Sequence, residues 1–328
     1  MNDDFLRELK QPIYDFSRIH NACVNREGFI FYLGETPSVY DDLIIRHPTD
    51  TKLWSPQPDV SSRTLEEHIQ LINKYQLEKV TVICSDLSFI LRCPSIKQLS
   101  VHPSDDAGES FDYSPLYQMP NLRDVMLTMS SGRFDDYWYS VDYSKIKGLT
   151  DIGACGKGNN GYELVPTLET LWISNSKKHL DLKNISCSKK LWKLTMMCCN
   201  VKTLDGIEQY PEIKYVNMDM NRSLHDISAL RHAAGTLTSL CIEVCPKVKD
   251  FSVLNTLVNL EYLQLHGSNS LPNLEFLQHM PKLKVFNFTM NVEDGDLTNC
   301  MNIPYATCKN RKHYNLKDSQ LPKTRPQR

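Results

Sequence analysis

Residues 237–243, LTSLCIE, and residues 260–266, LEYLQLH, share one pattern, in which three apolar residues are separated by two residues and then by one. Six clear copies of this pattern begin 22 to 24 residues apart. They are Leu168-Leu171-Ile173, Leu191-Leu194-Met196, Ile213-Val216-Met218, Leu237-Leu240-Ile242, Leu260-Leu263-Leu265 and Leu283-Phe286-Phe288. Self-similarity at so short a period is typical of a solenoid, in which each repeat is one coil.

Weaker copies extend the array toward the N-terminus, at Leu77-Val80-Val82, Ile96-Leu99-Val101, Leu122-Val125-Leu127 and Leu149-Ile152-Ala154. The centre of each copy predicts a short strand with alternating side chains, so that Leu240 and Ile242 enter the core while Cys241 faces away. One coil is too thin to bury its own apolar side, and the stacking of coils supplies the missing wall. We therefore expect about ten short strands in one parallel sheet.

A second regularity lies eight residues after the first apolar position, where the residue is small and able to form hydrogen bonds. The residues at this position are Ser85, Ser104, Ser130, Ser176, Cys199, Asn221, Cys245, Ser268 and Asn291, and only Lys157 departs from the rule. The chain turns inward here, so we expect these side chains to satisfy buried backbone groups of the neighbouring coil.

The repeat length and segments such as DISAL at 226–230 and DFSVL at 250–254 resemble the leucine-rich-repeat family, in its short, bacterial-type internalin-like subclass. The resemblance covers residues 77–298. It implies an α/β solenoid, a horseshoe with the parallel sheet on its concave side and short helical turns on its convex side. It also implies a recognition surface, without naming the partner.

The segments outside the array predict a cap at each end. Residues 64–76 read as a helix that begins with a capping box of Thr64 and Glu67, and we expect residues 1–76 to form an N-terminal cap. Residues 299–328 are expected to form a C-terminal cap and a basic tail. From Lys309 onward the chain contains seven lysines and arginines and one aspartate, so we expect disorder at the extreme end.

The composition of the chain limits the classes of function that we expect for it. The formal net charge is −2 and the pI about 6.6, which gives no reason to expect nucleic acid or a membrane as partner. The opening MNDDFLRELK does not resemble a signal peptide, and the eleven cysteines are odd in number and contain no C-x2-C pair. We therefore expect a cytoplasmic protein with free thiols and with no metal or cofactor.

An irregular segment from Pro103 to Ser144 carries eight aspartates and glutamates against two arginines, together with eight aromatic residues. This composition is typical of an interface, because aromatic rings supply rigid contact area and carboxylates select a basic partner. The predicted binding residues here are Asp135, Asp136, Tyr137 and Trp138. The alternative is that the aromatic residues only pack on the edge of the solenoid.

The second predicted surface is the concave sheet, whose outward side chains follow from the repeat. Its predicted binding residues are Met126, Trp172, Tyr215, Asn217, Asp219, Glu243, Tyr262 and His266. Ten strands would span about 43 Å, which suits a folded protein better than a small molecule.

No motif of a known catalytic site occurs in the sequence, so we predict a non-catalytic protein-protein interaction module. One alternative is an intracellular inhibitor or immunity protein for a basic enzyme such as a nuclease toxin. An enzyme whose site is gathered from several coils and a purely structural scaffold are further alternatives.

Overall fold

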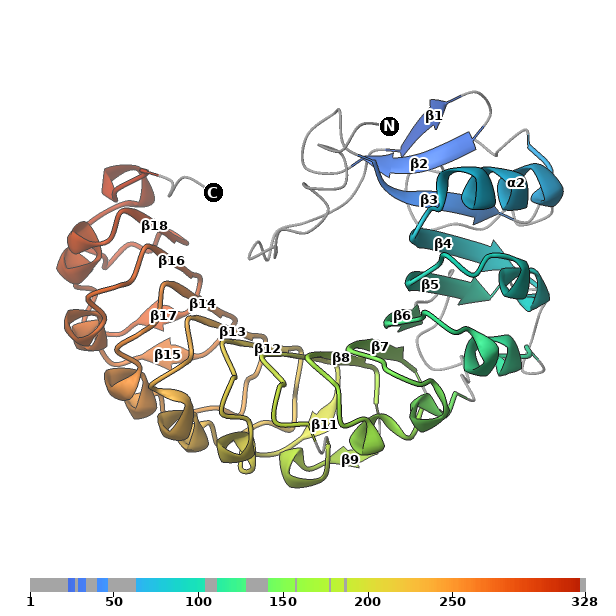
Figure 1. Cartoon of the computed structure of the whole chain (residues 1–328). Coiled ribbons are helices and arrows are strands. Elements are labelled where there is room, and N and C mark those ends of the chain that lie inside the picture. Colours follow the sequence, from blue (N-terminus) through green and yellow to red (C-terminus); the bar gives the residue numbers. More distant parts are fainter. Residues whose placement is uncertain are drawn as a thin grey trace. The chain divides into compact units, whose positions relative to one another are not determined.

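The structure, a computed structural model, describes residues 23–26, 29–33, 40–46, 63–103, 111–127, 141–156, 158–176, 178–185 and 188–324. The chain forms two compact units, Met1–Tyr162 and Glu163–Arg328. Both consist of coils in which a strand, a corner and a short helical turn follow one another (Figure 1).

The first unit contains seven strands and one α-helix among its described residues. The strands are β1 (Cys23–Arg26), β2 (Phe29–Leu33), β3 (Tyr40–Arg46), β4 (Lys79–Cys84), β5 (Gln98–Pro103), β6 (Asp124–Leu127) and β7 (Asp151–Cys155). β1, β2 and β3 pair in antiparallel fashion, whereas β3 to β7 are parallel. The helical turns of its coils are η1 (Ser88–Arg92), η3 (Ser114–Gln118) and η4 (Tyr143–Lys145), and η5 (Tyr162–Leu164) lies at the division between the units.

The predicted helix is confirmed as α2 (Leu65–Tyr75). Thr64 Oγ1 accepts a hydrogen bond from the Glu67 N–H at 3.2 Å, and Glu67 Oε2 accepts one from the Thr64 N–H at 2.8 Å. These bonds satisfy two free donors at the helix start. The bond from the Thr64 backbone and the neighbouring Arg63 lower the pKa of Glu67 to about 2.

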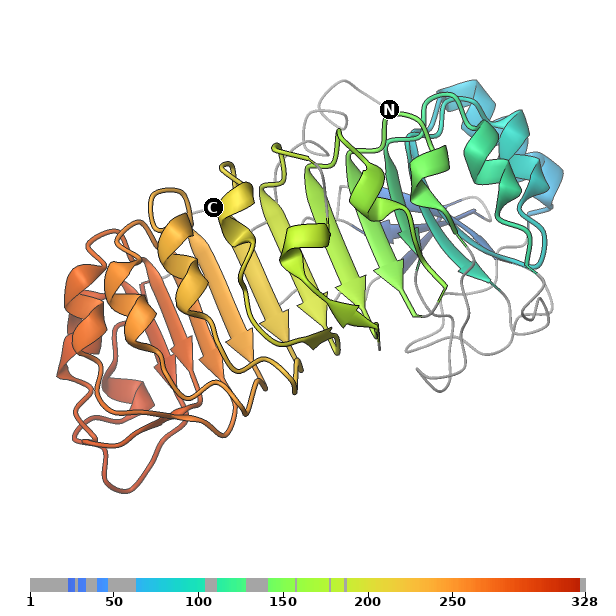
Figure 2. The ribbon, with the colours of Figure 1, turned by 90° about the horizontal axis from the view of Figure 1, so that it is seen from below.

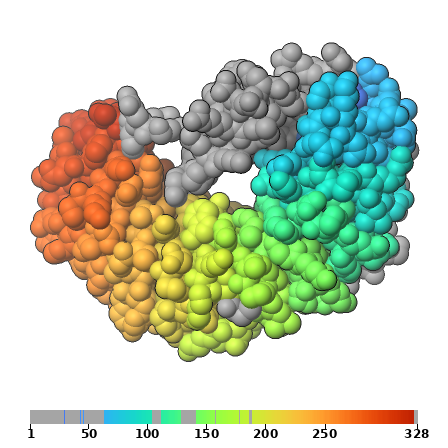
Figure 3. Space-filling model, in the orientation of Figure 1, coloured from blue at the N-terminus to red at the C-terminus, as the bar shows by residue number. Residues whose placement is uncertain are grey.

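The second unit is a stack of seven parallel strands. They are β8 (Thr170–Ser174), β10 (Lys193–Met197), β12 (Tyr215–Asp219), β13 (Ser239–Glu243), β14 (Tyr262–His266), β16 (Val285–Phe288) and β18 (Tyr305–Cys308). In this unit the strands line the inner, concave side and the helical turns the outer side (Figures 1 and 2). The coils pack directly against one another in the space-filling view (Figure 3).

The outer side of the second unit carries 3₁₀ turns and two small parallel sheets. The turns are η6 (Leu182–Asn184), η7 (Ile207–Gln209), η8 (Ser228–Ala233), η9 (Ser252–Thr256), η10 (Glu275–His279), η11 (Thr298–Asn302) and η12 (Asp318–Gln320). The small sheets pair β9 (His179–Leu180) with β11 (Asn200–Val201) and β15 (Ser270–Leu271) with β17 (Asn291–Val292). The predicted short helical turns are therefore confirmed.

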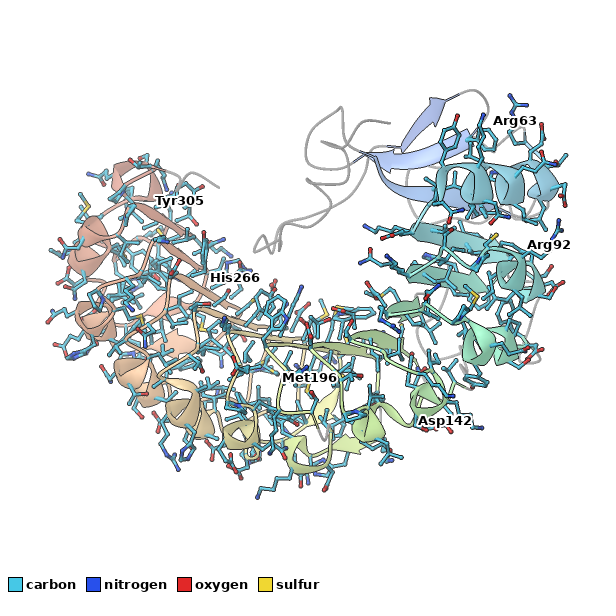
Figure 4. All side chains as sticks on the ribbon, in the orientation of Figure 1. Arg63, Arg92, Asp142, Met196, His266 and Tyr305 are labelled. Carbon is cyan, nitrogen blue, oxygen red and sulfur yellow. The ribbon has the colours of Figure 1, made fainter. Side chains whose placement is uncertain are left out.

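The predicted strands and their alternation are confirmed. Each of the ten predicted copies contains a strand, and β18 adds one beyond residue 298. Leu240 and Ile242 are completely buried, and Met196 lies inside its coil (Figure 4). Cys241 faces away from the core on the concave side, as predicted, although its exposed fraction is only 1%. Flanking side chains on this side therefore shield it from solvent.

The hydrogen-bonding ladder is confirmed at three positions and displaced at a fourth. Asn221 is completely buried; its Oδ1 accepts from the Cys199 N–H at 2.8 Å and its Nδ2 donates to the Met196 carbonyl at 2.9 Å. The thiols of Cys199 and Cys245 donate to the carbonyls of Ile173 and Met218, at 3.4 and 3.5 Å. Ser268 is exposed, and Asn269 takes its place because this corner holds one extra residue. Ser104 and Ser130 lie outside the described residues.

The segments DISAL and DFSVL begin the turns η8 and η9. Asp226 Oδ1 accepts a hydrogen bond from the Ser228 N–H at 2.8 Å, and Asp250 does the same with Ser252. These bonds lower the pKa of both aspartates. The acidic residue therefore fixes the point at which the chain enters each turn.

The described part of the basic tail, which ends at residue 324, is folded. Tyr314 is buried, and its hydroxyl accepts a hydrogen bond from the Val292 N–H at 3.0 Å. Residues 325–328 lie outside the described part.

Candidate functional site

The concave face of the second unit collects most of the predicted binding residues. Trp172 comes from β8, and the others come from β12, β13 and β14, namely Tyr215, Asn217, Asp219, Glu243, Tyr262 and His266. His266 lies on the inner side of its strand (Figure 4). Parallel pairing without register shifts brings these residues into straight rows across the strands.

Two groups of predicted residues lie elsewhere. Met126 belongs to β6 in the first unit, where its thioether fills the space that a Cβ on Gly153 would need. Asp135, Asp136, Tyr137 and Trp138 lie outside the described residues.

Three rows run across β12, β13 and β14. The titratable row consists of Asp219, Glu243 and His266. The amide row consists of Asn217, Cys241 and Gln264 and continues to Asn287 on β16. The tyrosine row consists of Tyr215, Ser239 and Tyr262. Neighbouring strands are about 4.8 Å apart, so side chains within a row are direct neighbours.

Glu243 and His266 form a pair within the titratable row. His266 Nδ1 lies 3.8 Å from Glu243 Oε1, and Gln264 Nε2 donates to Glu243 Oε2 at 3.3 Å. The neighbouring His266 side chain holds the pKa of Glu243 below its usual value despite partial burial. Burial alone would lower the pKa of His266, but the neighbouring side chains of Glu243 and Asn287 outweigh it and raise that pKa.

The ionised carboxylate of Asp219 is less stabilised by its surroundings than that of Glu243. Burial and the charge of Glu243 raise the pKa of Asp219 to about 6, and only the nearby Met220 N–H opposes this change. No ion pair joins Asp219 to a cation in the part of the chain that the structure describes. Among the described side chains, the basic group that pairs with this row is His266, and it pairs with Glu243.

Several polar atoms on this face are buried without a hydrogen-bond partner. They are Asn217 Oδ1, Asp219 Oδ1, Ser239 Oγ and His266 Nε2, and Ser239 is completely buried. A buried polar atom left unpaired costs about 1–3 kcal/mol. Such atoms in a native structure call for an explanation, and a bound partner provides one.

Within the tyrosine row, Tyr215 is largely covered. Its exposed fraction is only 6%, and Lys193 Nζ lies 5.1 Å from the centre of its ring. Tyr215 therefore offers little accessible surface, because the Lys193 side chain on the neighbouring strand lies over the ring. Trp172 and Tyr262 are half-buried and remain accessible.

A further row, which the repeat pattern did not reveal, follows directly after the strands. We call Cys198, Met220 and Val244 the corner row; their φ angles are 54°, 52° and 48°. The Met220 N–H donates to the Glu243 carbonyl at 2.9 Å, and the Val244 N–H donates to the His266 carbonyl at 3.0 Å. The same corner in other coils holds Asn175 and Gly267, which suit a left-handed backbone.

The corner row is unfavourable in two respects. A residue other than glycine in the left-handed region costs about 1–3 kcal/mol, and a β-branched residue such as Val244 is a true outlier there. Met220 and Val244 are also 46% and 38% exposed. Apolar residues at three successive corners where asparagine or glycine fits better are the sequence signal that could have revealed this row.

Metal binding and nucleophilic chemistry place distinct requirements on the side chains of this face. Cys84, Cys93, Cys241, Cys245, Cys300 and Cys308 are free thiols, and no group of three metal-binding side chains occurs among the described residues. Burial and the charges of Glu243 and Asp219 raise the pKa of the Cys241 thiol, so the thiolate that a nucleophile requires is disfavoured. No helix within the described ranges is long and apolar enough to cross a membrane.

The coils, their ladder and their parallel sheet form a solenoid with the leucine-rich-repeat fold. No family model and no curated protein matches the chain. Among solved structures it is similar to an internalin, InlF, of Listeria monocytogenes, with 14% identity over 72% of this chain and 69% of the other and a TM-score of 0.48.

Two further solved structures are similar to the chain. The functional domain of InlJ from Listeria monocytogenes, described as including a cysteine ladder, is 17% identical over 69% of this chain and 50% of the other, with a TM-score of 0.45. A leucine-rich-repeat protein of Leptospira interrogans is 12% identical over 76% and 81%, with a TM-score of 0.35. These neighbours are leucine-rich-repeat proteins, internalins among them.

Proposed function

We propose that the chain is a non-catalytic interaction module that binds a protein through the concave face of the unit Glu163–Arg328. The observation that carries this proposal is the set of buried, unpaired polar atoms on that face, at Asn217, Asp219, Ser239 and His266. A rigid array of strands offers these groups to a partner at little cost in conformational entropy. Solenoids of this class generally use such extended concave surfaces for protein binding.

The partner in this proposal is basic. Asp219 and Glu243 stand side by side, and the segment from Pro103 to Ser144 is acidic. Opposite charge speeds the encounter of two proteins and excludes wrong partners. An inhibitor of a basic enzyme, such as an immunity protein against a nuclease, is one form of this function. The free thiols favour a reducing compartment such as the cytoplasm.

A dispersed catalytic site is the second candidate, because three groups with shifted pKa values lie together in the titratable row. The candidate nucleophile in this region is the thiol of Cys241, but it is buried and protonated. General acid-base chemistry alone would then have to be carried by the carboxyl groups and His266. A binding function accounts for the carboxyl groups and His266 without requiring them to carry out general acid-base chemistry.

Parallel capture experiments test the proposed function. The wild-type chain, a concave variant (Trp172→Ala with Tyr262→Ala) and a convex variant (His279→Ala with Met301→Ala) are immobilised and exposed to lysate. We expect proteins retained by the wild type and by the convex variant to be lost from the concave variant. Equal retention by all three would refute the concave face as the binding surface.

A further inference from the structure

Resting on the proposed function, we propose that the titratable row and the corner row together form an anchor site for a segment that presents an arginine beside an apolar residue. The arginine would occupy the side of Asp219 that lacks a cation. The apolar residue would lie on Met220 and Val244. The partner is therefore a protein whose binding segment is both cationic and apolar.

The cationic half of the site follows from the carboxyl pair. Asp219 and Glu243 are in register on adjacent strands, and the charged neighbour among the described side chains is His266, at 3.8 Å from Glu243. A second cation beside Asp219 would relieve the repulsion between two carboxylates. This is electrostatic complementarity of the kind that fixes the register of two bound proteins.

Unpaired acceptors indicate the shape of that cation. Asn217 Oδ1 and Asp219 Oδ1 are both buried without a donor, and they lie two residues apart on the concave side of β12. The unpaired Oγ of Ser239 lies four residues along β13 from Glu243 and is completely buried, so it is not part of this acceptor set. A guanidinium group carries five N–H donors in a planar fork and can serve two acceptors at once, whereas an ammonium group is a point charge.

The apolar half of the site follows from the corner row. Met220 directly follows Asp219, and Val244 directly follows Glu243, so the apolar and the acidic groups alternate along this edge. Both apolar side chains are exposed, on a backbone that disfavours them. Strain of this type is retained at ligand-binding positions, and methionine adapts its shape to varied apolar groups.

The Cys198 side chain extends the corner row by one coil. Its thiol lies 3.7 Å from the Met220 sulfur, so the soft atoms of the two corners form one continuous patch. On the opposite side Gly267 ends the row without a side chain. An apolar residue of the partner therefore meets Met220 at the centre of the patch, one residue away from the carboxyl pair.

Short peptides test this inference directly on the full chain. The probes are acetyl-Arg-Leu-amide, its neutral isostere acetyl-citrulline-Leu-amide, and acetyl-Arg-Ser-amide. Binding is followed by NMR of the chain labelled with ¹³C at the methionine methyl groups, with Met220 assigned by Met220→Leu. We expect saturable shifts of the Met220 methyl signal with the first peptide and at least a tenfold weaker Kd with each of the other two.

Variants locate the binding of the peptide. Asp219→Asn should weaken the Kd for acetyl-Arg-Leu-amide at least tenfold, whereas the exposed Glu212→Gln should leave it unchanged. Equal binding of the arginine and citrulline peptides, absence of saturation, or an unaffected Asp219→Asn variant would each overturn the inference.

The capture experiment keeps this inference separate from the proposed function. If the concave variant loses its captured protein while Asp219→Asn retains it, the concave face binds but the anchor site does not exist. If neither variant loses the protein, the proposed function itself fails.

Discussion

Asp219 and Glu243 stand opposite each other on β12 and β13, and the pKa of the first is raised while that of the second is lowered. Burial and the charge of Glu243 raise the pKa of Asp219, whereas the neighbouring His266 lowers that of Glu243. The ionised form of Asp219 therefore works against the folded state at neutral pH. A chain that keeps such a group gives up stability, which is the usual cost of a binding site.

Replacing Asp219 by asparagine should stabilise the protein at pH 7. The folded state holds the Asp219 proton more tightly than the unfolded chain, so this group lowers stability as the pH rises from 3.8 to about 6. Because the side chain is only partly buried, we expect a gain of about 1–2 kcal/mol at pH 7, less than the full pKa shift would give. Urea unfolding across a pH series measures it.

The gain from Asp219→Asn should disappear below about pH 3, where the carboxyl group is neutral in both states. The control is Asp205→Asn, which removes an exposed charge from the convex side of the unit. A gain that is the same at about pH 3 and pH 7 would show that the charge of Asp219 does not oppose folding.

Replacing Val244 by asparagine should also stabilise the fold, by about 1 kcal/mol. Asparagine tolerates the left-handed backbone that a β-branched residue resists, and it occupies the same corner at Asn175. Val258→Asn is the matched control, because Val258 is similarly exposed but lies outside the left-handed region. A melting temperature that rises equally in both variants would mean that relief of strain is not the cause.

Replacing Asn221 by alanine should destabilise the second unit by about 2–4 kcal/mol. The substitution leaves the Cys199 N–H and the Met196 carbonyl without their partner inside the coil. Asn255→Ala serves as the control, since Asn255 is exposed and bonds only within its own turn. The denaturant midpoints of unfolding should differ clearly between the two variants. Similar midpoints would show that the ladder has no structural role.

The native thiols should differ in reactivity. Cys198 is half-buried, whereas Cys241 and Cys245 are buried and burial raises the pKa of both. We expect iodoacetamide to label Cys198 much faster than the other two, as read by peptide mass spectrometry, and all eleven cysteines to be labelled after denaturation. Labelling of Cys241 at the rate of Cys198 would contradict the packing of the concave face.

The coils could be predicted from the sequence because they depend on the spacing of residues close together in the chain. The spacing of apolar residues such as Leu240 and Ile242 decides which side of a strand is buried, and each coil repeats that decision. The capping box at Thr64 and Glu67 is equally local. The ladder position at Ser268 was wrong because one added residue in that corner shifts the inward turn to Asn269.

The site was predicted only as a surface. Alternation placed Asp219, Glu243 and His266 on the concave side, but their proximity depends on the register between coils. The burial of Tyr215 and Cys241 depends on the side chains of the neighbouring strands, which spacing along the chain does not reveal. The strain at Met220 and Val244 depends on backbone angles, although their residue types are unusual for a corner.

The most direct test of the central claim is hydrogen exchange on the complex between the chain and the protein that it captures. Binding on the concave face should slow exchange in the corners at 219–220 and 243–244 and leave the convex turns η8 to η10 unchanged. Protection confined to those convex turns, with no change at the two corners, would contradict the account.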